Sequence, residues 1–252
     1  MIARNILIHA MEDLLGSNRF KDYTINGLQV EGCERIEKIM TGVTASQALL
    51  DEAVAWGADM VLVHHGYFWK NEPVAITGMK RQRIAALLNN DINLVAYHLP
   101  VDAHPELGNN AMLAKKLGWS IEGAIDAPLG EGILFFGTLD VPMSNQAMAA
   151  HIEDVLRRPP LVVEGHNRDI RKIAWCTGGA QDMISAAADA GVDAFVSGEI
   201  SERTTHLARE QGISYFSAGH HATERYGIEA LGNWLAAQYP ITHRFVDIDN
   251  PA

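Results

Sequence analysis

The segment Val61-Leu62-Val63-His64-His65-Gly66-Tyr67-Phe68-Trp69 indicates the class of fold, because an apolar run here leads directly into potential metal ligands. Met60 to Val63 are apolar and mostly favour extended structure, which predicts a buried strand. His64 and His65 then lie in the loop at the carboxyl end of that strand. Both rings can converge only if the chain turns, and Gly66 permits such a turn.

This strand belongs to a predicted βαβ unit. Residues 38–43 form its first strand, Thr44 or Ser46 caps the following helix, and that helix extends to about Trp56. Gly57 ends the helix and the chain returns to the strand that precedes His64. Strands joined by a crossover of this kind are parallel, so the pattern predicts an α/β protein.

The later part of the chain repeats this unit. Lys38-Ile39 recurs as Lys172-Ile173, 134 positions later. At the same spacing three further residues recur in kind, namely Gln47 at Gln181, Gly57 at Gly191 and Asp59 at Asp193. The correspondence continues, across a shorter connection, from 92–98 to 213–220. We therefore expect two related α/β halves, each with a mostly parallel sheet.

Three segments follow from this repeat. Residues 1–125 form the first α/β half and residues 167–252 form the second. Residues 126–166 form a connecting subdomain that combines a β-rich run, a helix near 144–156 and a short strand. This β-rich connection joins the two halves in the expected fold.

Composition restricts the classes of function. The 252 residues carry a formal net charge of −11, which argues against binding to duplex nucleic acid. No apolar run reaches the roughly 18 residues that a membrane span needs, and the N-terminus does not resemble a signal peptide. The two cysteines, Cys33 and Cys176, are too few for a disulfide framework, so we expect a cytoplasmic protein.

Further candidate ligands follow other predicted strands. His98 and Asp102 come after the strand at 92–97, and His220 follows the corresponding strand of the second half. Glu224 lies four residues after His220, so the two share one face if a helix begins there. Open α/β sheets bind ligands at the carboxyl ends of their strands. The two adjacent histidines, Asp102, His220 and Glu224 make a mixed set of five nitrogen and oxygen donors, which exceeds what one tetrahedral zinc ion takes and suits two metal ions.

Each residue also has an ordinary structural interpretation. A single histidine at a strand end is usually a hydrogen-bonded surface or core residue. Asp102 is compatible with bracing a loop, and Glu224 with the first-turn acid that the helix dipole favours. His98 is expected either to orient a ligand or to contact substrate. Glu199, which lies 134 positions after His65, is either a general acid or base or a capping residue.

Several segments together resemble one protein family. They are Val63-His64-His65-Gly66, His98-Leu99-Pro100-Val101-Asp102 with Gly108-Asn109-Asn110, Ser197-Gly198-Glu199 and Gly219-His220-His221-Ala222-Thr223-Glu224. The family is that of the GTP cyclohydrolase 1 type 2 homologs, also called the NGG-interacting-factor family. The resemblance spans nearly the whole chain and is close to short enterobacterial members associated with radiation resistance. The large inserted domain of longer members is absent from the sequence.

The resemblance implies two divalent metal ions per chain. His64, His65, Asp102 and His220 would be ligands, and Glu224 would bridge both metals. It also implies a ring-shaped hexamer. The donor set favours Fe, Mn, Zn or Co over Ca.

We therefore expect a metal-dependent hydrolase with a small-molecule substrate, such as a purine nucleotide or a damaged nucleotide. The catalytic candidates are His98 and Glu199. The alternatives are a non-catalytic metal-delivery or scaffold protein, and an oligomer whose metals are purely structural.

Overall fold

The computed structural model describes residues 1–127 and 130–252 and divides the chain into two compact units. Unit 1 comprises Met1–Val101 and Gly227–Asp249, and unit 2 comprises Asp102–Tyr226 and Asn250–Ala252. Each unit is a mixed α/β structure, which confirms the expected fold class.

The sheet of unit 1 has five strands in the order β13-β4-β5-β6-β2. In that order the strands are Thr242–Phe245, Lys38–Thr44, Met60–His65, Asn93–Ala96 and Gly27–Val30. All neighbours are parallel except β2, which pairs antiparallel with β6. The run that precedes His64 is therefore a central parallel strand, and its residues from Met60 to Val63 are fully buried. His64 and His65 are the last two residues of β5 and therefore lie at the carboxyl end of the central strand.

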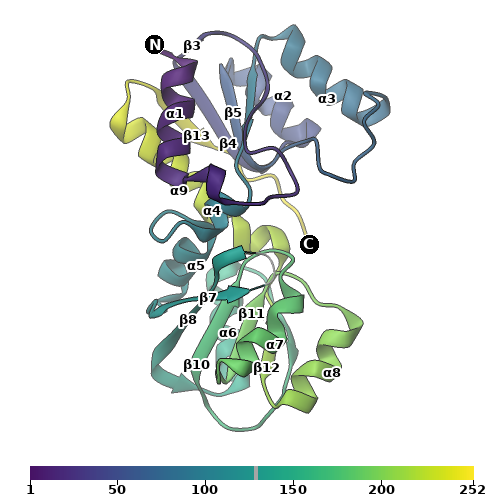
Figure 1. Ribbon diagram of the computed structural model, residues 1–252, viewed down its shortest axis with the longest axis vertical. Helices are drawn as coiled ribbons and strands as arrows, with labels where there is room; N and C mark the ends of the chain where they lie inside the picture. The colour runs from purple at the N-terminus through teal and green to yellow at the C-terminus, as the bar shows by residue number, and fades with distance from the viewer. Residues whose placement is uncertain (128–129) are drawn as a thin grey trace. The chain divides into compact units, whose positions relative to one another are not determined.

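Helices cover both faces of this sheet, as Figure 1 shows. On one face lie α1 (Arg4–Leu15) and the unit 1 part of α9 (His220–Gln238), and on the other lie α2 (Gln47–Trp56) and α3 (Gly78–Asn89). Alternation along β5 supplies both cores, because Leu62 packs with α1 and α9 while Val61 and Val63 pack with α2 and α3. Burial on both faces explains why this strand is a continuous apolar run.

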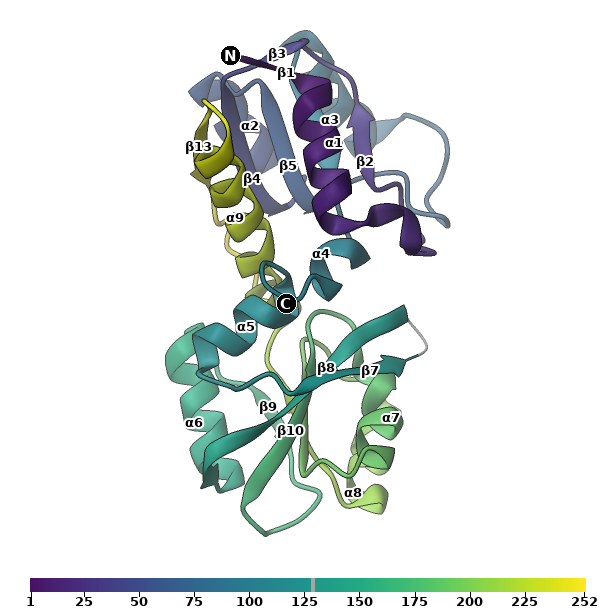
Figure 2. The same ribbon diagram turned by 60° about the vertical axis from the view of Figure 1, so that its left-hand side comes forward.

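The sheet of unit 2 has six strands in the order β7-β8-β10-β11-β12-β9. In that order the strands are Gly123–Ala127, Gly130–Met143, Ile170–Cys176, Ala194–Ser197, Ser214–Ser217 and Leu161–Val163. The central three are parallel and the outer pairings are antiparallel. The helices are α5 (Asn109–Leu117), α6 (Asn145–Leu156), α7 (Ile184–Asp189) and α8 (Glu202–Gln211). Figure 2 shows α6 on one side of this sheet and α7 and α8 on the other.

Strand register agrees with the repeat inferred from the sequence. In unit 1 Ile39 pairs with Met60, and in unit 2 Ile173 pairs with Ala194, each pair displaced by the same 134 positions. A partly buried aspartate just before the second strand has the same role in both units. Asp59 Oδ2 accepts hydrogen bonds from the amides of residues 37 and 38, and Asp193 Oδ2 accepts them from those of residues 171 and 172.

The repeat shifts by one residue at the ends of the next strands. The amide of Tyr97 donates to the Val63 carbonyl, and the amide of Ala218 donates to the Ser197 carbonyl. These equivalent bonds place Gly219, rather than His220, at the position of His98. The correspondence expected between His98 and His220 is therefore off by one residue.

Helix ends follow the expected signals. Ser46, rather than Thr44, caps α2, since its side chain accepts from the amide of Leu49. Gly57 adopts the left-handed conformation after α2, as predicted, and Gly16 does the same after α1. The predicted division into segments 1–125, 126–166 and 167–252 rests on the sequence repeat and stays a prediction. Residues 128 and 129 of the connecting segment lie outside the described residues.

No helix within residues 1–127 and 130–252 is long and apolar enough to cross a membrane. Shorter elements are also present. Strands β1 (Ile2–Ala3) and β3 (Arg35–Ile36) pair antiparallel, the short helix α4 covers Leu99–Ala103, and 3-10 turns cover Ser17–Arg19 and Gln181–Met183.

His243 on β13 should make unit 1 sensitive to acid. Its Nδ1 donates to Asn233 Oδ1 at 3.0 Å and its Nε2 accepts from the Thr41 hydroxyl at 2.7 Å, a pattern that suits the neutral ring. Burial lowers the pKa of His243 to about 4. Between pH 6.5 and 4 the unfolded chain binds a proton that the folded chain does not, so stability falls as the pH falls through this window. Above pH 6.5 this contribution is fully present.

Thermal unfolding of wild type and His243→Gln between pH 7.5 and 4.5 measures this contribution. The melting temperature of the variant should fall less steeply across the window. His206→Gln, in which an exposed histidine is replaced, serves as the control. Identical slopes for wild type and His243→Gln would show that His243 does not link protonation to folding.

Candidate metal centre

Unit 1 gathers three histidines at the carboxyl ends of β5 and β6. His64 is fully buried and its Nδ1 lies 3.0 Å from the Tyr97 carbonyl oxygen. His65 Nδ1 lies 3.2 Å from Thr44 Oγ1, and His98 Nδ1 lies 2.9 Å from Asp22 Oδ1. One nitrogen from each ring lies within 4.8 Å of the others. We refer to His64, His65 and His98 as the histidine cluster.

The hydrogen bonds of the histidine cluster fit metal binding. A carbonyl oxygen can only accept, so His64 Nδ1 carries the proton and Nε2 carries the lone pair. A carboxylate likewise only accepts, which makes His98 Nδ1 the donor to Asp22. Ligating histidines typically donate their other nitrogen to a carbonyl or carboxylate in this way. The donor set therefore suits a transition-metal ion.

Asp22 holds His98 in place. Burial alone would raise the pKa of Asp22, but hydrogen bonding and charge interaction with His98, with further hydrogen bonds from Asn26 and Leu99, leave that pKa below its usual value. The carboxyl group is only 2% exposed. Asn26 Oδ1 also accepts from the His98 amide at 2.8 Å. These bonds hold the His98 ring close to those of His64 and His65.

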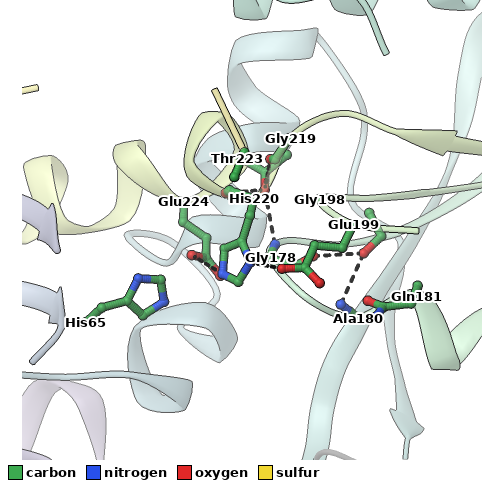
Figure 3. A network of polar contacts seen from close by, with 12 residues as sticks. His65, Gly178, Ala180, Gln181, Gly198, Glu199, Gly219, His220, Thr223 and Glu224 are labelled. Carbon is green, nitrogen blue, oxygen red and sulfur yellow. Dashed lines mark hydrogen bonds and ion pairs between the residues drawn. The ribbon is translucent and has the colours of Figure 1, made fainter. Parts of the chain in front are cut away.

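Unit 2 places His220 between two carboxylates, as Figure 3 shows. His220 begins α9, its Nδ1 lies 2.6 Å from Glu199 Oε1, and its Nε2 lies 3.0 Å from Glu224 Oε2. Burial opposes the charged ring, but the hydrogen bonds and charges of Glu224 and Glu199 raise the pKa of His220 to about 9. Glu224 lies one turn along the same helix, as the i, i+4 spacing predicted, and is 3% exposed.

Asp102 is also buried in unit 2. It lies on α4 rather than in a loop, and Asn109 Nδ2 donates to its Oδ1 at 2.8 Å while the Thr177 hydroxyl donates at 3.3 Å. A carboxylate oxygen of Asp102 and one of Glu224 lie within 4.8 Å of each other. Two buried carboxylates at this separation repel unless a cation or a proton lies between them, which again fits a metal.

Glycine loops allow these side chains to approach. Gly178 has φ +66°, and a Cβ atom there would overlap the Glu224 carboxylate. At Gly198 a Cβ atom would lie 2.7 Å from both the Gly178 oxygen and the His220 Cα atom. The Gly178 amide donates to Thr223 Oγ1 at 3.0 Å, which ties this loop to the first turn of α9 (Figure 3). Side chains at these positions would push the loops away from His220 and Glu224.

Several residues that support the donors did not emerge from the sequence. Asp22, Thr44, Asn109 and Thr177 all bond to candidate ligands. Only Asn109 carried a signal, because it lies in the Gly108-Asn109-Asn110 segment. The others are polar residues in loops or at strand ends, a common and uninformative setting.

Unit 1 also contains a cavity of about 820 Å³ between the end of α1 and the loop that follows it. Its lining is mainly polar or acidic and includes Glu12, Asp13 and Asp22. Asp22 and Asn26 both line this cavity and both bond to His98 of the histidine cluster.

The fold and these side chains define a class of protein. It is an α/β protein built from two units, each with buried histidine or carboxylate side chains that could bind a metal near the carboxyl ends of its parallel strands. The chain belongs to the Duf34/NIF3 (NGG1p interacting factor 3) family, whose profile matches residues 2–251.

Curated relatives support this assignment. A Pseudomonas aeruginosa protein named GTP cyclohydrolase 1 type 2 homolog is 53% identical over 251 residues, covering 100% of this chain and 99% of the relative. A Pasteurella multocida protein of the same name is 58% identical over 242 residues, covering 94% and 95%.

Solved structures agree with the fold. Protein ybgI, described as of unknown function, is 52% identical and superposes with a TM-score of 0.96 over 100% of both chains. A Thermus thermophilus protein is 30% identical with a TM-score of 0.90, also over 100% of both chains.

Glu199→Gln should weaken metal binding through His220. The carboxylate fixes the His220 ring so that Nε2 faces Glu224, and losing such an outer partner typically costs about 10- to 100-fold in metal affinity. Isothermal titration with Zn²⁺ measures the change. Glu202→Gln is the control, because Glu202 is exposed and pairs with His206 instead. Equal affinity in both variants would leave Glu199 without an orienting role.

Proposed function

We propose that this protein is a dinuclear metal-dependent hydrolase whose ligands are His64, His65, Asp102, His220 and Glu224. The observation that carries the proposal is the buried pair of carboxylates in unit 2, Asp102 and Glu224, with His220 bonded to the second. His64 and His65 of the histidine cluster are the proposed nitrogen donors from unit 1. Iron, manganese, zinc and cobalt suit this mixture of imidazole and carboxylate.

Two divalent ions held by these residues would supply Lewis acidity, which would lower the pKa of water at the site and polarise a substrate bond. The residues of the chain bind and orient the groups at the site. Glu224 is the proposed bridge, since its carboxylate is buried and oriented by the first turn of α9. Asn109 and Thr177 donate hydrogen bonds to Oδ1 of Asp102. These bonds set the orientation of the carboxylate and therefore the direction of its other oxygen.

The roles of the two catalytic candidates differ from each other. Glu199 is bonded to His220 Nδ1 and therefore acts first by orienting that ring, although its side chain is 48% exposed and accessible to a substrate proton. His98 lies beside His64, with ring centroids 5.0 Å apart, and its Nδ1 is held by Asp22. His98 is thus positioned to contact substrate or to complete the nitrogen donor set.

The substrate class rests on the names of the relatives. GTP cyclohydrolase 1 type 2 homolog points to a purine nucleotide, and we extend this to damaged nucleotides. A cytoplasmic location and a homohexameric assembly belong to the same proposal. Sedimentation velocity should then give a mass near six times the chain mass of 27.6 kDa.

Elemental analysis of the purified, untagged protein tests the metal assignment directly. We expect about two transition-metal ions per chain in the wild type and loss of both in a His64→Ala, Glu224→Ala double variant. Turnover of purine nucleotides is then screened with metal-loaded wild type. Bound metal without turnover of any nucleotide would favour a metal-delivery protein, and a wild type that binds no metal after reconstitution would exclude the hydrolase.

A further inference from the structure

Three consecutive aromatic residues after β5 point to different surroundings. Tyr67 is 4% exposed and its hydroxyl donates to the Ala45 carbonyl at 2.8 Å, so it belongs to the core. Phe68 packs against the same core, with Lys80 Nζ 4.8 Å from its ring centroid. Trp69 instead turns to the histidine cluster, where its ring centroid lies 5.0 Å from that of His98 and 5.9 Å from that of His65.

A second aromatic ring lies beside Trp69. The Tyr23 ring centroid is 5.8 Å from that of Trp69 and 5.1 Å from that of His98. Tyr23 is 42% exposed, which is unusual for an aromatic residue so close to buried histidines. We call Tyr23 and Trp69 the aromatic pair.

The turn that carries Trp69 is held in a strained conformation. Phe68 has φ +64°, a value that costs a residue with a Cβ atom about 1 kcal/mol or more. Glu72 Oε2 stabilises the turn by accepting from the Phe68 amide at 2.7 Å and the Trp69 amide at 3.2 Å. The indole Nε1 donates to the Gly66 carbonyl at 3.2 Å. Strain that is maintained in this way next to candidate ligands indicates a functional constraint on Trp69.

The loops that carry the two rings are bonded to each other. The Lys70 amide donates to the Tyr23 carbonyl at 2.8 Å, and the Thr24 hydroxyl donates to the Tyr67 carbonyl at 3.2 Å. These bonds join the backbones of the two loops, and each ring also contacts His98 of the histidine cluster without any ligand present. Preorganised rings bind a ligand without the entropic cost of ordering them.

We propose that the aromatic pair is a stacking surface for the planar heteroaromatic ring of the substrate. This inference rests on the proposed function, since it places the bound ring beside the histidines assigned to the metal. Tyrosine and tryptophan present flat, polarisable faces on which any nucleobase stacks. Neither ring carries charge, and the neighbouring Asp22 is buried against His98, so the surface recognises the base rather than the phosphate.

The test compares two ligands that differ only in the base. Guanosine 5′-monophosphate carries a purine, and ribose 5-phosphate carries the same sugar and phosphate without it. Binding of each to metal-loaded protein is measured by isothermal titration for wild type, Trp69→Leu, Trp69→Phe and Tyr23→Leu. The matched control is Trp56→Leu, which replaces another partly buried tryptophan of unit 1, one that packs beside Lys38.

We expect Trp69→Leu and Tyr23→Leu to weaken binding of guanosine 5′-monophosphate by about 5- to 100-fold. Trp69→Phe, which keeps a ring, should stay within about 3-fold of wild type. Binding of ribose 5-phosphate should not change in any variant. Melting temperature and metal content, measured on the same samples, report whether a variant is folded and loaded.

Two results would overturn the stacking surface: equal binding of guanosine 5′-monophosphate by Trp69→Leu and Trp56→Leu, or no binding by metal-loaded wild type. Turnover is scored separately by chromatography. A wild type that binds the nucleotide through Trp69 and hydrolyses nothing would refute the hydrolase and leave the stacking surface standing.

Discussion

Glu224→Gln should lower the metal content by at least half while leaving the fold intact. The substitution keeps the size of a side chain that is 3% exposed, but it removes the negative charge and one strong donor oxygen. Loss of an outer partner costs about 10- to 100-fold in metal affinity, and loss of Glu224, the proposed bridging ligand, should exceed that range. We expect metal content to fall by at least half and hydrolysis to disappear with it.

Metal content by mass spectrometry and thermal unfolding of the same preparation check this expectation. Glu229→Gln is the matched control, because Glu229 lies on the same helix α9 and belongs to none of the donor groups. It should retain metal and activity. Full turnover by Glu224→Gln with the metal gone would show that the reaction does not use this centre.

Gly178→Ala should also remove metal, although residue 178 offers no ligand. The added Cβ atom would overlap the Glu224 carboxylate and lie 3.1 Å from His220 Nε2, so one of the two side chains must move. Since φ at this position is +66°, the substitution also costs about 1 kcal/mol in backbone energy. The expected result is a loss of metal affinity far larger than the loss of stability explains.

Gly191→Ala separates these two effects. Gly191 lies in the same unit with φ +72°, and a Cβ atom there meets nothing within 4 Å. Both variants therefore carry a similar backbone cost, and only Gly178→Ala disturbs the donors. We expect metal loss in Gly178→Ala alone, with an unfolding midpoint below that of Gly191→Ala only by the steric cost of moving one side chain. Similar metal affinities in the two variants would show that the loop adjusts around Glu224 without consequence.

The sequence predicted the scaffold well because the scaffold is encoded locally. The apolar run before His64, the cap at Ser46 and the left-handed Gly57 each determine the structure of their own neighbourhood. The repeat at 134 positions extended this knowledge to unit 2. The i, i+4 spacing also predicted that His220 and Glu224 share one helix face, and both lie on α9.

Interactions between distant segments were not predictable in the same way. Asp22 is 76 residues from His98, and Thr177 is 75 residues from Asp102. No periodicity relates such pairs, and an aspartate or threonine in a loop has many ordinary roles. The one-residue shift at Gly219 was missed for a related reason, since it depends on hydrogen bonds between strands rather than on residue types.

The recurring aspartates, Asp59 and Asp193, have a consequence for how such a protein diversifies. Each accepts two amide hydrogen bonds and thereby fixes the amino end of its strand pair, the end opposite to the candidate metal ligands. The architecture of each copy is thus secured without help from the residues at the other edge. The residues at the other end can therefore differ between the two units, and His64 and His65 of unit 1 correspond, at the spacing of 134 positions, to Gly198 and Glu199 of unit 2. The same type of strand pair thus carries two adjacent imidazoles in one unit and a glycine followed by a carboxylate in the other.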